Sequence, residues 1–305
     1  MESIQIPGLE PIPPLGMGTW QWGDTLFWDY GKGYADGDLE AAFKEALAAG
    51  IRLYDTAEVY GRGKSERLLG QFVRRCGQRP LIASKCFPFP WRFSRKSLIT
   101  ALKGSLRRLG MERLDLYLLH WPWPPVPLEG WAEALVEAYE LGLVRAVGVS
   151  NCNLAQTERV SRVLARHNVK LAANQVEYSL LERRAEHSGL LEALRAEGTV
   201  LMAYSPLGMG WLTGKYSPQN PPTGAMRGRK YRAKEGKIPG LIRVLQEVAQ
   251  AHQATPAQVA LRWCIQKGSL PIPGAKSPAQ ARANAGALNL RLSEEEMRLL
   301  DSASA

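Results

Sequence analysis

The sequence alternates short apolar segments with longer amphipathic ones, and it repeats this alternation eight times. The apolar segments show no regular exchange of polar and apolar residues, which is typical of parallel strands covered on both faces. Eight strand–helix units in one chain favour a closed parallel barrel over an open sheet. The predicted strands are Leu15–Trp20, Ile51–Tyr54, Leu81–Ser84, Leu114–Leu119, Arg145–Val149, Ala172–Val176, Val200–Tyr204 and Leu270–Ile272.

The amphipathic segments between these strands have helical periodicity, and several of them stop at a glycine. Glycine just past the end of a helix is expected because it adopts the left-handed conformation that caps the last turn. Ser293 and the glutamates after it mark the start of the last helix. The predicted helices are Leu39–Ala49, Ser65–Arg75, Ser97–Leu109, Trp131–Leu141, Leu154–Arg166, Ser188–Ala196, Leu241–His252, Pro256–Gln266, Pro278–Ala287 and Glu294–Leu300.

The ends of the chain complete the predicted architecture. Ile4–Pro14 is expected to form a short hairpin, with Pro7-Gly8 in the turn. No shift of composition marks a second domain, so residues 1–305 are expected to form one α/β domain. We expect a (β/α)8 TIM barrel with a short N-terminal β-hairpin and a C-terminal closing helix. The stretch Ser217–Pro239, rich in Pro, Gly and basic residues, is long enough to be a functional lid or a disordered loop.

Composition and charge exclude several classes of protein. Apolar residues make up 45% of the chain and charged residues 22%, which is ordinary for a folded, soluble enzyme. We read no signal peptide at Met1 and no apolar run of about 20 residues, the length that a membrane span needs. The four cysteines form no CxxC pair, so we expect neither disulfides nor structural zinc, and a cytoplasmic location.

The formal net charge of +10 is compatible with an anionic ligand. A nucleic-acid binder would gather its cations on one face with aromatic residues between them. Here Lys and Arg are scattered, apart from a concentration between Lys215 and Lys237. We therefore expect no nucleic-acid or membrane partner, and a field that draws in a small anion such as a dinucleotide.

Four polar residues follow three successive strands of the predicted barrel. Asp55 and Tyr60 come after the second strand, Lys85 ends the third, and His120 ends the fourth. Taken singly, the Asp could cap a turn, and the Tyr and His could be packing residues. A lysine at the end of an apolar strand is costly unless it has a partner. Because the active site of such barrels lies at the C-terminal strand ends, the four together predict one catalytic site.

These four residue types match the needs of carbonyl reduction. Hydride attack on a carbonyl carbon builds negative charge on the oxygen, which must then be hydrogen-bonded and protonated. We expect Tyr60 to be the proton donor and Lys85 to lower the pKa of that phenol. Asp55 would keep Lys85 charged, and His120 would orient the carbonyl oxygen. In the oxidation direction Tyr60 would act as the base.

Over nearly its whole length the chain resembles the aldo-keto reductase superfamily. This resemblance implies a (β/α)8 barrel, NADPH as hydride donor, no metal, and an aldehyde, ketone or sugar carbonyl as substrate. The matching motifs, in the order of that family, are Gly16-Met17-Gly18-Thr19-Trp20, Asp55-Thr56-Ala57-Glu58-Val59-Tyr60-Gly61, Ser84-Lys85, Leu118-Leu119-His120-Trp121, Gly148-Val149-Ser150-Asn151, Asn174-Gln175-Val176-Glu177-Tyr178, Ala203-Tyr204-Ser205-Pro206-Leu207-Gly208 and Ile272-Pro273-Gly274-Ala275-Lys276.

The resemblance also implies which residues bind the cofactor. Some would lie around the nicotinamide and its ribose, namely Thr19, Trp20, Asp55, Ser150, Asn151, Gln175 and Tyr204. Ser205 is a further residue expected to bind the cofactor. Others would hold the pyrophosphate, namely the backbone from Leu207 and Gly208 to Leu212, Lys215 and Arg227. The 2′-phosphate and adenine would lie against Gly274, Lys276, Gln280 and Asn284. One large branch of the family has Arg at the position of Gln280 and an acid at Ala283, which weakens the preference for NADPH over NADH.

Two other nucleotide motifs are absent. Gly208 to Gly214 has the spacing GxGxxxG and not GxGxxG, so it misses the Rossmann fingerprint. Gly214-Lys215 resembles the end of a phosphate-binding loop, but Gly208 is one residue too far upstream. Tyr216 also replaces the Ser or Thr that binds magnesium in such loops.

Aromatic residues are expected to line the substrate pocket, and they would suit ring-bearing or apolar carbonyl compounds. These are Trp22, Phe27, Phe87, Trp91 and Trp121. The connection Pro122–Leu128 is short and the chain ends soon after Leu300, which predicts an open mouth and broad specificity.

Two other functions share this sequence pattern. The chain could be a cofactor-sensing regulatory subunit similar to the potassium-channel β subunits, which resemble the same family. It could also be an aldolase or isomerase with Lys85 as a Schiff-base nucleophile. The sequence leaves the physiological substrate, the oligomeric state and the reaction direction open.

Overall fold

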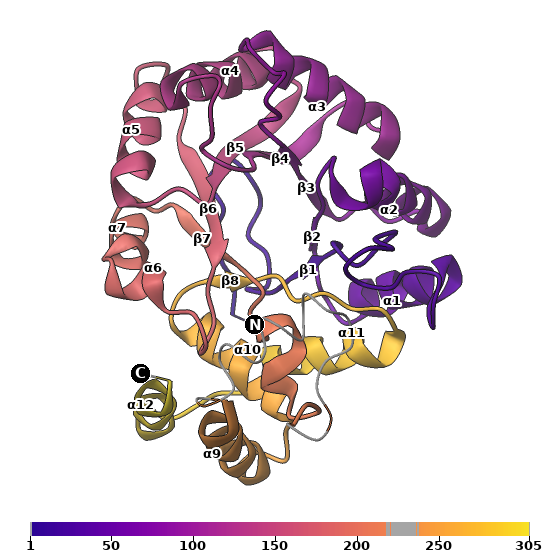
Figure 1. The fold of residues 1–305 in the computed structure, drawn as a ribbon, viewed down its shortest axis with the longest axis vertical. Coiled ribbons are helices and arrows are strands. Elements are labelled where there is room, and N and C mark those ends of the chain that lie inside the picture. The colour runs from indigo at the N-terminus through magenta and orange to yellow at the C-terminus, as the bar shows by residue number, and fades with distance from the viewer. Residues whose placement is uncertain (1, 218–219, 221–235, 237, 305) are drawn as a thin grey trace.

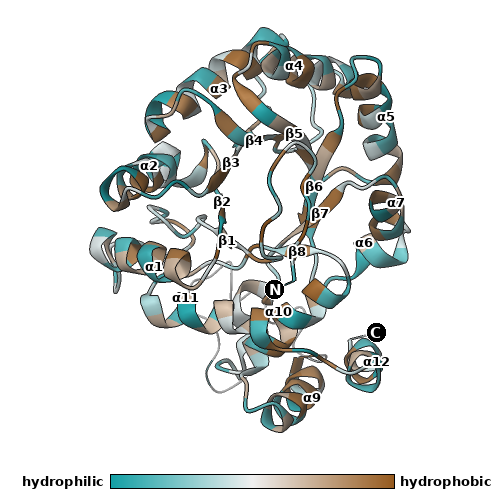
Figure 2. Ribbon diagram, turned by 180° about the vertical axis from the view of Figure 1, so that it is seen from behind, coloured by the Kyte–Doolittle hydropathy of each residue, from teal (hydrophilic) through white to brown (hydrophobic). Residues whose placement is uncertain are grey.

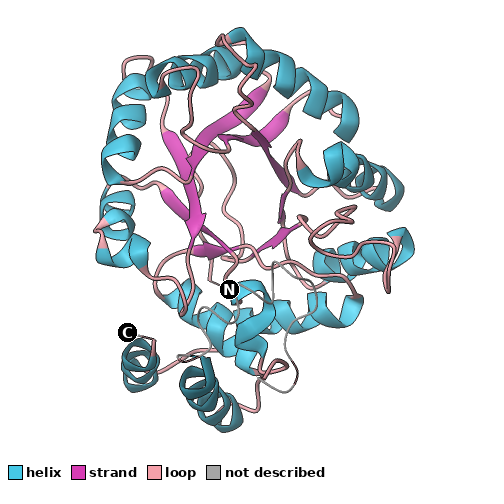
Figure 3. Cartoon of the chain, in the orientation of Figure 1, coloured by secondary structure: helices cyan, strands magenta, loops and turns pink. Residues whose placement is uncertain are grey.

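The computed structural model describes residues 2–217, 220, 236 and 238–304. Eight strands form one parallel sheet in chain order, from β1 next to β2 through to β8. Figures 1 and 3 show this sheet as a ring of strands enclosed by helices. The strands are β1 (Gly16–Gly18), β2 (Leu53–Asp55), β3 (Leu81–Cys86), β4 (Leu114–Leu119), β5 (Val144–Ser150), β6 (Leu171–Glu177), β7 (Val200–Tyr204) and β8 (Leu270–Pro271).

The ring closes between its first and last strands. Gly18 of β1 forms a parallel bridge with Gly274, and its N–H donates to the carbonyl oxygen of Pro273 at 3.0 Å. A Cβ on Gly18 would lie 2.8 Å from the carbonyl oxygen of Ile272, so glycine is what allows this close approach. The predicted (β/α)8 barrel is therefore confirmed.

Helices surround the ring because each buries one apolar face against the strands. Predicted N-cap Ser293 accepts a hydrogen bond from the N–H of Glu296, and Asn153 and Thr255 cap their helices in the same way. The helices are α1 (Asp36–Ala48), α2 (Lys64–Cys76), α3 (Lys96–Leu109), α4 (Leu128–Glu140), α5 (Leu154–Ala165), α6 (Arg184–His187), α7 (Leu190–Ala196), α9 (Ile238–Ala251), α10 (Pro256–Gln266), α11 (Pro278–Ala285) and α12 (Glu294–Ala303).

Two local predictions differ from the structure. The predicted helix Ser188–Ala196 begins only at Leu190, because Gly189 takes a left-handed φ of 75° and separates α7 from the short helix α6. The predicted hairpin Ile4–Pro14 is reduced to one antiparallel bridge between Ile4 and Ile12, and its turn contains Gly8 with φ 83°.

The N-terminal segment covers one end of the barrel. Ile6, Leu9 and Ile12 are buried in the cluster of apolar side chains that fills the barrel interior. Glu10 in this segment forms an ion pair with Arg145 at the start of β5, with Nη2 and Oε2 2.5 Å apart. Figure 2, the view from behind, shows the N-terminal segment crossing the barrel. The strand starts are therefore covered, and the open end of the barrel is the one at the C-terminal strand ends.

Among the described residues, no helix is long and apolar enough to cross a bilayer. The same part of the chain contains no group of three or more His, Cys, Asp or Glu side chains that could hold a metal ion. We therefore expect a functional site at the open end of the barrel.

Candidate active site

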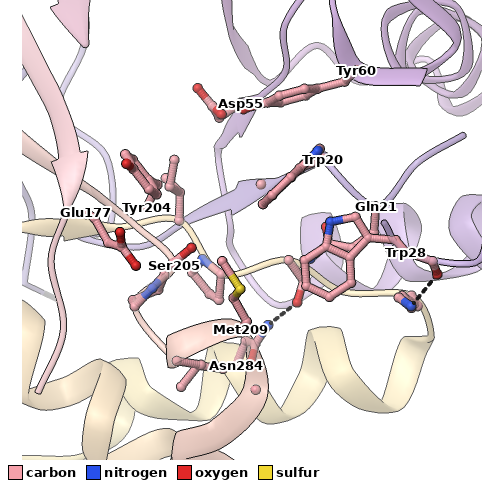
Figure 4. A pocket seen from close by; sticks show the side chains of 18 of the residues that line it. Trp20, Gln21, Trp28, Asp55, Tyr60, Glu177, Tyr204, Ser205, Met209 and Asn284 are labelled. Atoms are coloured by element: carbon pink, nitrogen blue, oxygen red, sulfur yellow. Dashed lines mark hydrogen bonds between the residues drawn. The ribbon is translucent and has the colours of Figure 1, made fainter. Parts of the chain in front are cut away.

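A cavity of about 930 Å³ lies at the C-terminal ends of the strands. Figure 4 shows Asp55 and Tyr60 on one side of this cavity and Met209 and Asn284 on the opposite side, with Trp20 between them. The lining residues from the strand ends and the loops next to them are Gly18, Trp20, Asp55, Tyr60, Phe87, His120, Trp121, Ser150, Asn151, Gln175, Glu177 and Tyr204.

Lys85 and Asp55 form a buried ion pair beneath the cavity floor. The ammonium nitrogen of Lys85 lies 2.6 Å from Oδ2 of Asp55, and 0% and 3% of the two side chains are exposed. Lys85 also donates to the carbonyl oxygen of Thr56 at 2.8 Å and to the hydroxyl oxygen of Tyr60 at 3.4 Å. All three donors of the ammonium group are therefore used, and one of them reaches the phenol.

A hydroxyl network holds the backbone on both sides of Asp55. Thr19 donates from Oγ1 to the carbonyl oxygen of Asp55 at 2.9 Å. Oγ of Ser65 lies 2.7 Å from Oγ1 of Thr19 and 2.9 Å from Oγ1 of Thr56. Thr19 does not line the cavity. Thr19 therefore holds the backbone of Asp55 from outside the cavity.

Tyr60 begins the short 3-10 helix Tyr60–Gly63, directly after β2. Its ring centroid lies 5.9 Å from that of His120 in an edge-on arrangement and 6.3 Å from that of Trp20 in a stacked one. Gly61 follows with φ 53°, and a Cβ there would lie 2.6 Å from the carbonyl oxygen of Gly23. This glycine therefore permits the turn that brings the phenol over Lys85.

Burial decides the protonation of the site. It raises the pKa of Tyr60 well above its usual value, and the charge of Asp55 and the nearby Tyr204 add to the rise. Burial also raises the pKa of Asp55 and lowers that of Lys85, while their mutual attraction opposes both shifts. The prediction that Lys85 brings the phenol pKa down toward neutrality is corrected, because desolvation dominates. The phenol of Tyr60 therefore stays protonated and neutral.

His120 is a neutral imidazole at the edge of the same group. Burial lowers the pKa of its ring well below 6.5, and the charge of Lys85 adds to this shift. Its Nδ1 atom is buried and has no hydrogen-bond partner in the described part of the chain. Its carbonyl oxygen accepts from Nδ2 of Asn151 at 3.0 Å. The ring is thus held close to Tyr60, and its Nδ1 atom is available for a hydrogen bond.

One hydrogen-bonded chain joins the opposite wall to the ion pair. Tyr204 donates its hydroxyl to Oδ1 of Asn151 at 3.0 Å, and Nδ2 of Asn151 donates to Oγ of Ser150 at 3.0 Å. Ser150 donates to the carbonyl oxygen of Gln175 at 2.8 Å, and Nε2 of Gln175 donates to Oδ1 of Asp55 at 2.8 Å. Residues predicted from four different motifs are thus brought into one polar network.

The far part of the cavity contains the residues predicted to bind the adenosine end of a cofactor. Gly274, Lys276, Gln280 and Asn284 all line it. Lys276 donates from Nζ to the carbonyl oxygen of Trp28 at 3.0 Å, and its backbone N–H donates to Oε1 of Gln280 at 2.8 Å. The Nζ atom also lies 4.3 Å from the centroid of the Tyr34 ring. Lys276 is thus held by the loop that follows β1.

The residues predicted to hold a pyrophosphate lie on the adjacent wall. Leu207 and Lys215 line the cavity, whereas Gly208 is buried just behind it. Ser205, also predicted to bind the cofactor, lines the cavity as well. The backbone from Gly208 to Thr213 has 3-10 turns interrupted by the left-handed residues Met209 (φ 58°) and Gly210 (φ 93°), so it is irregular. Arg227 lies outside the described residues.

Of the five aromatic residues predicted to line the substrate pocket, two line the cavity and three do not. Phe87 and Trp121 are part of its wall. Trp22 is fully buried in the core and donates from Nε1 to the carbonyl oxygen of Ala275 at 3.2 Å. Trp91 is 67% exposed and stacks on Phe89 with ring centroids 4.6 Å apart. The chain turns after β1 and β3, so strand alternation does not extend to these side chains.

Phe27 does not line the cavity. It stacks instead on Trp20, with ring centroids 4.8 Å apart. The aromatic ring that faces the cavity at this position is therefore Trp20.

Several lining side chains were not predicted from the sequence, among them Gln21, Trp28, Glu177 and the side chain of Met209, of which only the backbone was expected to contribute. Glu177 could have been found, because it follows Gln175 by two residues on β6 and strand side chains alternate between faces. Gln21, Trp28 and Met209 belong to irregular loops, where no periodic signal exists. Met209, for example, takes a positive φ of 58°.

The chain is similar to proteins of one family. The family model described as "Aldo/keto reductase family" matches residues 14–305. A chloroplastic pyridoxal reductase of Arabidopsis thaliana is 39% identical over 307 residues, which cover 96% of this chain and 83% of that protein. A methylglyoxal reductase of Escherichia coli is 31% identical, with 99% and 94% covered. The crystal structure of a Klebsiella pneumoniae aldo/keto reductase in complex with NADP and acetate is 30% identical. It covers 98% of this chain and 94% of its own, with a TM-score of 0.76.

Proposed function

The chain belongs to the aldo/keto reductase family, and from this we propose that it reduces an aldehyde or ketone to an alcohol with NADPH as hydride donor. The observation that carries the proposal is the convergence of four side chains at one end of the cavity. Lys85 contacts both Asp55 and Tyr60, and His120 packs edge-on against Tyr60.

The described residues fit NADPH along the length of the cavity. Asn151, Ser150 and Gln175 offer amide and hydroxyl groups that suit a carboxamide edge, and the Tyr204 ring suits stacking on a flat heterocycle. At the other end, Lys276 and Lys215 offer cations for phosphate groups. The Klebsiella relative is described with NADP. When bound, this cofactor supplies the hydride.

The side chains then stabilise and neutralise the negative charge that develops on the carbonyl oxygen. Neutral Tyr60 and neutral His120 each present one donor to that oxygen, and Tyr60 passes its proton to it. The resulting phenolate lies next to the Lys85 ammonium, which stabilises it. Asp55 keeps the ammonium charged and in place. In this scheme Lys85 acts on the product of proton transfer more than on the resting pKa of the phenol.

The aromatic wall supports a ring-bearing aldehyde as the first substrate to test. Phe87, Trp121 and Trp20 line the cavity next to Tyr60 and His120, and flat rings pack well against such surfaces. The pyridoxal reductase of Arabidopsis thaliana acts, by its name, on such a compound. Pyridoxal is therefore our preferred substrate, and methylglyoxal is the small aldehyde for comparison.

The two other functions predict different results. An aldolase or isomerase would need a nucleophilic Lys85, yet this amine is fully buried and all its donors are bonded. A cofactor-sensing regulatory subunit would bind NADPH without turnover of any carbonyl compound.

The decisive experiment measures NADPH oxidation against a panel of carbonyl compounds with the parent protein and Tyr60→Phe. We expect Tyr60→Phe to lose about 10²- to 10⁴-fold in kcat/KM while its Kd for NADPH stays unchanged. Tyr139→Phe, on the outer surface of α4, is the matched control. Turnover retained by Tyr60→Phe would mean that the proton donor is misassigned, and NADPH binding without turnover by the parent would favour the regulatory alternative.

A further inference from the structure

Arg92 folds the loop after β3 back onto its own start. Its Nη1 atom donates to the carbonyl oxygen of Phe87 at 2.7 Å and lies 3.2 Å from the sulfur of Cys86. Its guanidinium also lies 5.2 Å from the centroid of the Phe89 ring. One side chain therefore closes the segment from Cys86 to Arg92.

Glu58 completes this closure from the loop after β2. Its carboxylate accepts two hydrogen bonds from Arg92, from Nη1 at 2.5 Å and from Nη2 at 2.9 Å. Oε1 of Glu58 also accepts from the N–H of Phe87 at 2.7 Å. The pair thus engages both backbone polar groups of Phe87, and it ties the loop after β2 to the loop after β3.

The geometry of the pair is specific to its two side chains. Only 16% of the Arg92 side chain and 9% of the Glu58 side chain are exposed, so pairing must offset the cost of removing both charges from water. Two parallel hydrogen bonds from a planar guanidinium achieve this, and a lysine ammonium cannot reproduce them. The second N–H of Nη1 reaches the Phe87 carbonyl.

Phe87 is the residue that this closure holds, and its ring lies where a substrate would be recognised. It lines the cavity, and its centroid is 5.6 Å from that of His120 and 5.7 Å from that of Trp123, edge-on in both cases. Trp123 in turn stacks on Trp121 at 4.7 Å. The position of the Phe87 backbone thus sets the width of an aromatic slot next to His120.

We propose that Glu58 and Arg92 are positioning residues that fix Phe87 as a rigid wall of the substrate pocket and make the enzyme favour planar, ring-bearing aldehydes over small aliphatic ones. The proposal rests on carbonyl reduction as the activity. A wall that is already fixed loses little conformational freedom when a flat ring packs on it. A two-carbon or three-carbon aldehyde is too small to use that wall.

The test compares Arg92→Lys and Glu58→Gln with the parent on pyridoxal and on methylglyoxal. Each variant should lose about tenfold in kcat/KM for pyridoxal, mostly through KM, and less than about twofold for methylglyoxal. The Kd for NADPH should not change. The double variant should be little worse than either single one, because both substitutions break the same interaction.

Two further variants keep the test decisive. Arg159→Lys breaks an equally bidentate ion pair, to Glu129, whose side chains are 45% exposed on the outer helices, and it should alter neither substrate. Phe87→Leu removes the ring without touching the ion pair, and it should reproduce the loss of selectivity. A parallel loss on both aldehydes, or unchanged selectivity in Arg92→Lys and Phe87→Leu, overturns the inference.

A readout without turnover separates this inference from the proposed function. The ring-bearing alcohol pyridoxine can be titrated into the protein with NADPH present, using tryptophan fluorescence, because an alcohol and a reduced cofactor cannot exchange a hydride. Arg92→Lys should weaken pyridoxine binding about tenfold, whether or not the parent reduces any aldehyde tested. Unchanged pyridoxine affinity would overturn the positioning role, whereas an inactive parent would overturn the proposed function alone.

Discussion

Nζ of Lys85 lies 2.6 Å from Oδ2 of Asp55, with both side chains almost fully buried at the end of the barrel. A buried ion pair is costly to form and more costly to break, because the remaining partner becomes an unpaired charge in a medium of low polarity. The same pair lies under the Tyr60 hydroxyl. Stability and the proposed catalysis therefore depend on one contact.

Replacing Lys85 with methionine should leave the buried carboxylate of Asp55 without its ion-pair partner. We expect Lys85→Met to lower the free energy of unfolding by about 3–5 kcal/mol, as measured by urea denaturation. Adding Asp55→Asn should recover part of this loss, because no buried charge remains. Lys44→Met, which removes an exposed helical pair with Glu40, is the control and should cost less than about 0.5 kcal/mol. Equal effects of Lys85→Met and Lys44→Met would contradict the buried-pair interpretation.

His120 should make the folded state sensitive to acid. Its pKa is lowered well below 6.5 in the folded state, so below about pH 6.5 the unfolded chain binds a proton that the folded one does not. The slope contributed by this residue is then about 1.4 kcal/mol per pH unit, with stability falling as pH falls. Denaturation midpoints of the parent and His120→Gln should converge toward acid pH, and those of exposed His187→Gln should run parallel to the parent.

The reduction rate should be insensitive to alkaline pH. Burial raises the pKa of Tyr60 well above 10, so the phenol keeps its proton throughout the neutral range. We expect kcat for carbonyl reduction to stay level between about pH 7 and 9, since only ionisation of the phenol would remove the donor. In the oxidation direction, where Tyr60 must be the base, the rate should rise with pH over the same range. A fall in the reduction rate with an apparent pKa below 8 would contradict this assignment.

Lys276 should discriminate between the two nicotinamide cofactors. A cation near the ribose 2′-position recognises the phosphate of NADPH, and NADH lacks this group. Lys276→Gln should therefore raise the Kd for NADPH about tenfold and leave that for NADH unchanged. Lys215→Gln is the informative comparison, because a cation on the pyrophosphate should affect both cofactors alike. Equal losses of affinity for NADPH and NADH in Lys276→Gln would show that Lys276 does not bind the 2′-phosphate.

The barrel and the positions of the four catalytic candidates could be predicted from the sequence. Both depend on local patterns, such as the buried strand runs and the polar residues directly after them. Because neighbouring parallel strands end at the same edge, Asp55 at the end of β2 and Lys85 near the end of β3 were bound to be neighbours. The order of the strands needed no further information once eight units were counted.

The orientation of side chains outside the strands was not predictable in this way. Trp20 and Trp22 are two residues apart and would share a face on a continuous strand, yet β1 ends at Gly18 and the N–H of Trp22 turns back to the carbonyl oxygen of Thr19. Trp20 therefore faces the cavity and Trp22 the core. Trp91 fails for the same reason, since the loop after β3 places it in solvent.

The sequence by itself determined the fold and the set of reactive groups, because hydrophobic period and strand-end position are properties of short segments. Only the tertiary structure decided the pKa values of those groups and which side chains pack around them. Desolvation by distant side chains sets the pKa of Tyr60, and the bond between Glu58 and Arg92 joins residues 34 positions apart. Burial and long-range contact depend on how the whole chain packs, and no local segment encodes them.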